Sequence, residues 1–96
     1  MHNIIKEAVL KQLCLSFDYE NYDRTVEPHC VGLTTKNNYA VRAYQTLGSS
    51  STGNLGWKMF EIGKMKNLKI LDQEFSPARP GYKRGDKGMK TIIAEL

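Results

Sequence analysis

Residues 13–19 read LCLSFDY, and apolar side chains in this stretch alternate with polar or small ones. A period of two residues is typical of a β-strand with one buried face. We expect Leu13, Leu15 and Phe17 to point into a core, and the polar residues 20–23 to end the strand. The stretch therefore predicts a protein built on a sheet.

A short amphipathic helix is predicted before this strand, over residues 3–11. Its apolar side chains recur at the spacing of one helical face: Ile4, Ile5, Ala8 and Val9. Four more strands are predicted downstream, at residues 24–35, 39–44, 57–62 and 68–71. Pro28 in the first of these indicates a sheet edge, a strand end or a bulge.

The strand over residues 39–44 separates its side chains into two sets. Tyr39, Val41 and Ala43 share one face, predicted to be the inner one, while Arg42 and Tyr44 share the other. The Gly- and Ser-rich residues 47–56 that follow predict a hairpin loop.

The end of the chain is predicted to be a loop and a final helical turn. Residues 76–88, SPARPGYKRGDKG, are rich in Pro and Gly. The apolar residues that close the chain have a spacing compatible with one or two helical turns: Met89, Ile92, Ile93 and Leu96.

The predicted fold class is mainly β with a short N-terminal helix (α+β), with five strands in a small antiparallel barrel or a strongly curled sheet. The length of 96 residues predicts a single domain over residues 1–96 with one modest core. Two-lobed enzymes and repeat arrays are excluded by this length.

The net charge of +4 is concentrated in the middle of the chain. Residues 36–69 hold six of the basic side chains, and Glu61 is the one acid among them. This distribution favours a basic face for an anionic partner.

Cys14 and Cys30 lack the spacing of a metal site, and His2 and His29 do not complete one. We therefore expect reduced thiols, no metal and no cofactor. The N-terminal residues form neither a signal peptide nor a membrane span. The expectation is a soluble cytoplasmic protein without membrane contact.

Enzymatic motifs are absent from the sequence, since it has no GxSxG elbow, P-loop or HExxH. His29 is open to three interpretations: a general base, a phosphate contact or a partly exposed strand histidine. We expect a protein that is not an enzyme.

Basic side chains interleave with aromatic ones at three places in the chain: Arg42 with Tyr44, Trp57 with Lys58 and Phe60, and Tyr82 with Lys83 and Arg84. Lys64 and Lys66 add a pair of basic side chains to this series. Single-stranded nucleic acid is bound by such combinations, with cations on the phosphates and rings against the bases. For each ring a place in the core is the plainer alternative.

The order of these features resembles the WYL domain family over about residues 4–75. The matching positions are Ile5 and Ala8, Leu15 to Tyr19, Arg24-Thr25-Val26-Glu27-Pro28, Asn38-Tyr39-Ala40, Ala43-Tyr44, Lys58-Met59-Phe60, Gly63-Lys64-Met65, and Leu68, Leu71 and Phe75. Lys58 and Lys64 stand where the family has arginine. The resemblance implies an Sm-like or SH3-like barrel in a bacterial or phage protein. It also implies a ligand-sensing regulatory module with a basic pocket for nucleic acid or nucleotides.

The predicted function is therefore a non-enzymatic regulatory module that binds single-stranded nucleic acid or a nucleotide. The predicted binding residues are Arg24, His29, Tyr39, Arg42, Tyr44, Lys58 and Lys64. Arg42 is expected at the centre, with Lys58 beside it across the strand pair, and Lys87 in the tail is expected to lie away from them. Two alternatives are a module that binds a host or partner protein, and a small enzyme acting on nucleotides. The oligomeric state is left open, a homodimer included.

Overall fold

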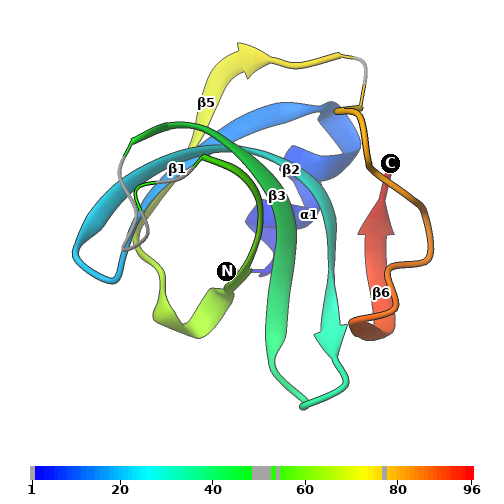
Figure 1. Ribbon diagram of the computed structural model, residues 1–96. Coiled ribbons are helices and arrows are strands. Elements are labelled where there is room, and N and C mark those ends of the chain that lie inside the picture. Colours follow the sequence, from blue (N-terminus) through cyan, green and yellow to red (C-terminus); the bar gives the residue numbers. More distant parts are fainter. Residues whose placement is uncertain (1, 49–52, 54, 77) are drawn as a thin grey trace.

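The chain forms one α-helix, one short 3₁₀ helix and six strands in the computed structural model, which describes residues 2–48, 53, 55–76 and 78–96 (Figure 1). In chain order they are α1 (His2–Lys11), β1 (Leu13–Tyr19), β2 (Tyr22–Thr34), β3 (Tyr39–Gly48), β4 (Gly56–Glu61), η1 (Ile62–Lys64), β5 (Lys66–Glu74) and β6 (Met89–Glu95). The predicted helix and the five predicted strands are confirmed. Half of the hairpin loop expected over residues 47–56 lies outside the described residues, and residues 47, 48 and 56 belong to β3 and β4.

The central strand of the sheet is β2, which is 13 residues long. One edge of β2 pairs with β3 along nearly its whole length, from Arg24 to Leu33. The other edge pairs first with β1 and then, beyond the end of β1, with β6. The strand order is β4-β3-β2-β1-β5, with β6 added to β2. The result is a six-stranded antiparallel sheet that is curled but not closed, so the expected count of five strands is wrong.

The predicted helical turn at the end of the chain is wrong, because Met89–Glu95 form strand β6. Thr91, Ile92 and Ile93 are β-branched and favour a strand. The part of β2 that β1 leaves unpaired supplies the partner for β6. A side chain at Gly32 of β2 would collide with the carbonyl oxygen of Thr91, so glycine permits this close pairing.

A bulge in β2 follows Pro28, in agreement with one of the three predicted interpretations of this proline. Pro28 pairs with Ala43, while Cys30 pairs with Arg42, so His29 is the extra residue on β2. A bulge of this kind redirects side chains on the longer strand. As a result His29 and Cys30 are both buried, and Cys30 lies opposite Arg42.

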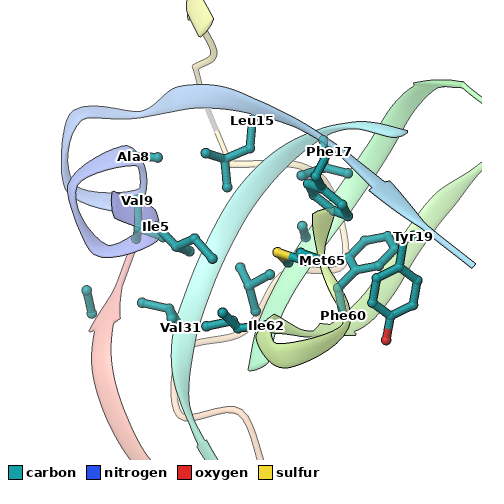
Figure 2. Packing of buried hydrophobic residues seen from close by; sticks show 14 residues of the cluster. Ile5, Ala8, Val9, Leu15, Phe17, Tyr19, Val31, Phe60, Ile62 and Met65 are labelled. Carbon is teal, nitrogen blue, oxygen red and sulfur yellow. The ribbon is translucent and has the colours of Figure 1, made fainter. Parts of the chain in front are cut away.

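The main core lies between α1 and the inner face of the sheet. Ile5, Ala8 and Val9 of α1 are fully buried, and Figure 2 shows their position beside β2. Aromatic rings fill the other end of this core, where Phe17 and Phe60 meet edge to face at 5.0 Å between ring centroids. None of the helices formed by the described residues has the length and apolar character needed to cross a bilayer.

The strand faces agree in part with the sequence pattern. Leu15, Val41 and Ala43 are fully buried, as predicted. Tyr39, predicted to point inward, is 45% exposed. Cys14 alternates with the inner residues and is nevertheless buried.

The outer face of the sheet is covered by the segment between β5 and β6. We call residues 75–88 the tail loop; Pro77 is not among the described residues. The prediction of a loop is confirmed here. Tyr82 of the tail loop packs on a second, smaller apolar cluster around Cys30, Ala40 and Met89. The sheet therefore has α1 on one face and the tail loop on the other.

Candidate functional site

The seven predicted binding residues are divided between the two faces of the sheet and its rim. His29, Arg42 and Tyr44 belong to the outer face, under the tail loop. Lys64 is in the 3₁₀ helix, and Tyr39 is the first residue of β3. The structure therefore does not bring the seven residues together into one site.

Lys58 does not lie beside Arg42, contrary to the prediction. The pairing of β3 with β4 sets Arg42 opposite Met59 and Ala43 opposite Lys58. Because neighbouring residues of a strand point to opposite faces, Lys58 shares the inner face with Phe60. Lys58 has no ion pair within the described part of the chain.

Arg24 is a core residue rather than an open cation, since only 3% of it is exposed. Its guanidinium lies within 5.4–5.7 Å of the ring centroids of Tyr19, Tyr22 and Phe60. It donates to the amide oxygen of Gln45 at 3.3 Å and to Glu20 at 3.4 Å. The Nε atom is buried without a hydrogen-bond partner. These contacts hold Arg24 among aromatic rings and away from solvent ligands.

Lys64 and Tyr39 lie at the rim of the inner face. The Lys64 ammonium is 2.8 Å from Glu61, and the pKa of Lys64 is raised chiefly because this ammonium donates a hydrogen bond to the Glu61 carboxylate. Tyr39 lines a cavity of about 590 Å³ with Glu61 and Lys64. One cation and one carboxylate in this lining leave it without a basic excess.

Arg42 joins the sheet to the tail loop. Its Nε donates to Oδ2 of Asp86 at 2.7 Å, and its Nη2 donates to Oδ1 at 3.4 Å. Asp86 also accepts a hydrogen bond from the backbone N–H of Gly88 at 2.8 Å. The hydrogen bond from Arg42 is the main reason that the pKa of Asp86 is lowered. Arg42 is therefore a fixed cation with one third of its side chain exposed.

A cavity of about 460 Å³ opens beside Arg42. Four cationic side chains line it: Arg42, Lys83, Arg84 and Lys87. Asp86 is the carboxylate in the lining, and Arg84 is 3.3 Å from Glu95. Lys83 and Lys87 are exposed, and neither has an ion pair among the residues that the structure describes. We call this cavity the basic cavity.

Two aromatic rings form the wall of the basic cavity. Trp57 and Tyr82 are stacked, with ring centroids 6.1 Å apart and planes 23° from parallel. The indole N–H of Trp57 donates to the carbonyl oxygen of Pro80 at 3.0 Å. Gly81 lies against this indole, where an added side chain would crowd Nε1. The rings are thus fixed in place beside the cations.

Other cavities on the described surface lack an excess of cationic side chains. In one of about 720 Å³, the carboxylates of Asp18, Glu20 and Asp23 outnumber Lys64 and Lys66. In another of about 410 Å³, Glu27 and Glu74 outnumber Arg79. The basic cavity is therefore the place that best fits an anion.

The tail loop is held to the outer face by Arg79 and Tyr82. Arg79 donates to both carboxylate oxygens of Glu27, at 2.6 and 3.1 Å, and its guanidinium lies 4.7 Å from the ring centroid of Tyr44. The ring of Tyr44 is thus covered by a protein cation. The hydroxyl of Tyr82 lies 3.3 Å from the carbonyl oxygen of His29. His29 itself is fully buried, so it is not a surface contact for phosphate.

Most of the basic cavity was missed by the sequence prediction, which placed Lys87 away from Arg42. The alternation of Tyr82 with Lys83 and Arg84 was the available signal. It did not show that the tail loop folds back onto β3 and β4.

Family models, curated proteins and solved structures all give no match to this chain. The candidate site is therefore defined by its geometry alone.

Proposed function

We propose that this protein is a non-enzymatic module that binds a nucleotide or single-stranded nucleic acid in the basic cavity. The observation that carries the proposal is the stacked pair of Trp57 and Tyr82 in the same cavity as four cations. Lys83 and Lys87, which have no acidic partner in the described structure, would contact phosphate. Arg42 and Asp86 would hold the floor of the cavity in shape.

The size and chemistry of the basic cavity suit one nucleotide. A volume of about 460 Å³ falls within the range of about 300–1,000 Å³ that is common for small-ligand sites. Stacking of a base on an aromatic ring contributes about 1–3 kcal/mol and tolerates any base. Contacts to phosphate add affinity that falls with salt. One stacked base with its flanking phosphates is the expected unit of recognition.

The resemblance to the WYL family supports a regulatory role for this binding. Arg24, Val26 and Pro28 lie on the central strand of the sheet, and a helix precedes the first strand, which is the order that the family has. On this proposal the curled sheet is an open variant of an Sm-like barrel. The protein would be a ligand-sensing module in the cytoplasm of a bacterium, encoded there or by a phage. Arg24 and Lys58 stand at positions where the family has arginine. In this protein they would contribute to the fold and would not contact the ligand.

A protein-interaction module is the second candidate function. Lys83 and Lys87 are exposed cations, and such charges suit an acidic protein surface. A host protein with an acidic surface would meet the same cations without needing the stacked rings.

Binding of short single-stranded DNA, RNA and mononucleotides, followed by fluorescence polarisation, tests the proposal. The variant Lys83→Glu/Lys87→Glu should bind far more weakly, and its log–log salt slope should be shallower by about 1.4, because each phosphate contact contributes about 0.7. The matched control is Lys6→Glu/Lys69→Glu, which changes charge equally at exposed residues of α1 and β5. Equal affinity of the two variants would refute the site. No binding to wild type at low salt, with an acidic protein retained in a nuclease-treated pull-down, would favour the second candidate.

A further inference from the structure

His29 has both ring nitrogens in hydrogen bonds inside the fold. Nδ1 is 2.8 Å from the carbonyl oxygen of Glu27, so it must carry the proton and donate. The backbone N–H of Arg79 in the tail loop donates to Nε2 at 3.1 Å. Nε2 can accept this bond only while it is unprotonated. The contact between sheet and tail loop therefore requires a neutral imidazole.

The surroundings of His29 add to this requirement. The rings of Trp57, Phe75 and Tyr82 lie 4.7–5.3 Å from the imidazole. The charged groups facing it are Glu27 on β2 and Arg79 on the tail loop. Two thiols lie in the same region, since Cys14 interacts electrostatically with Glu27 and Cys30 with Tyr82. A second proton on His29 would be buried, with the Arg79 amide pointing at it.

We propose that His29 is a positioning residue for the basic cavity: in its neutral form it holds the tail loop on the sheet, and its protonation releases the loop and weakens ligand binding. This inference rests on the proposed function only for the ligand, because the loop itself can be observed without one. Release of the tail loop would change the basic cavity directly, because four of the residues that line the cavity belong to this loop: Tyr82, Lys83, Arg84 and Lys87.

The direction of the pH effect follows from the state that binds more protons. Burial is the main cause that lowers the pKa of His29 in the folded protein, and Arg79 lowers it further, against raising effects from Glu27. With the loop open, the imidazole has a pKa of about 6.5. The closed loop is therefore fully favoured above about pH 6.5 and loses stability as pH falls below it. Between about pH 7.5 and pH 5.5 the ratio of closed to open loop falls by at most about tenfold.

Hydrogen exchange of the Arg79 amide in the ligand-free protein measures this ratio. Its protection factor, corrected for the intrinsic effect of pH, should fall several-fold between about pH 7.5 and pH 5.5. In His29→Gln the amide oxygen can accept the same N–H but does not titrate, so the protection should not change with pH. His2→Gln removes the other histidine and should behave as wild type. A protection factor independent of pH in wild type, or an equal fall in His29→Gln, would overturn the proposal.

The ligand arm uses oligothymidylate without terminal phosphate, because phosphodiesters and thymine do not titrate in this range whereas a terminal phosphate has a pKa near 6. Its affinity should fall between about pH 7.5 and pH 5.5 in wild type and His2→Gln, and stay constant in His29→Gln. An affinity that falls equally in all three proteins would contradict the role of His29. Failure of oligothymidylate to bind at every pH would refute the proposed function, while the exchange of the Arg79 amide would still decide whether His29 holds the loop.

Discussion

Arg42 on β3 and Asp86 in the tail loop, 44 residues apart in the chain, form a two-point ion pair with 2.7 Å between Nε and Oδ2. Only 11% of the Asp86 side chain is exposed, so its carboxylate depends on Arg42 and on the Gly88 amide for hydrogen bonds. The pair fixes the position of the tail loop over β3. Both side chains line the basic cavity, so the pair contributes to its shape.

Removal of one member of this pair should destabilise the protein more than removal of both. Arg42→Ala leaves the carboxylate of Asp86 short of a donor, and the free energy of unfolding should fall by about 1–2 kcal/mol. In Arg42→Ala/Asp86→Ala part of that loss should return, because no buried charge is left alone. Urea denaturation of wild type, both single variants and the double variant gives the coupling. Strict additivity would show that the two side chains do not interact.

Substitution of Leu15 tests which face of β1 is buried. Leu15→Asp places a charge in the core, at a cost of several kcal/mol that a domain with about 5–15 kcal/mol of stability can hardly tolerate. We expect no cooperative thermal transition in this variant. Ser16→Asp, the same change at the next, partly exposed position, should melt cooperatively. A folded Leu15→Asp protein would mean that the inner face of β1 is assigned wrongly.

Replacement of Arg24 tests whether this residue belongs to the core or to the ligand site. Arg24→Met keeps the length of the side chain and removes a buried charge whose Nε has no partner. The change also takes a hydrogen-bond donor from the Gln45 amide oxygen and the Tyr19 carbonyl oxygen. We therefore expect a loss of about 1–3 kcal/mol in the free energy of unfolding and unchanged oligonucleotide affinity. A variant that still melts cooperatively but binds ten times more weakly would place the ligand site on the inner face.

The two thiols should react slowly in the folded protein. Cys14 and Cys30 are fully buried, and burial raises the pKa of Cys14 and raises that of Cys30 to about 11. Since the thiolate is the reactive form, a disulfide reagent at about pH 8 should modify neither residue before denaturant is added. After unfolding, two thiols per chain should react. Equal rates in the folded and unfolded states would show that the cysteines are accessible.

Local patterns in the sequence predict the local elements well. The alternation of residues 13–19 depends only on one strand and its buried face, and α1 follows from the spacing of Ile5, Ala8 and Val9. These features need no knowledge of distant residues.

The features that escaped prediction depend on distant pairings. Met89–Glu95 form a strand because β2 extends beyond β1, which the spacing of Met89 and Ile92 does not show. The residue opposite Arg42 on β4 is Met59 and not Lys58. The register of this hairpin differs by one residue from the expected one, and such a difference moves every side chain of β4 to the opposite face. The tail loop contacts the sheet at His29, the extra residue of the bulge in β2. Because the sequence does not show this bulge contact, the cations of the tail loop could not be assigned to the site of Arg42 from sequence alone.

The emission of Trp57 during ligand titration tests the central claim most directly. Trp57 is the one tryptophan of the chain, and it lines the basic cavity against Tyr82. A base that enters the cavity must change the surroundings of this indole. We predict a saturable change in Trp57 emission with the same midpoint as the polarisation of a labelled single strand, abolished in Lys83→Glu/Lys87→Glu and retained in Lys6→Glu/Lys69→Glu. Saturable binding by polarisation with no change in Trp57 emission would contradict the assignment of the ligand to this cavity.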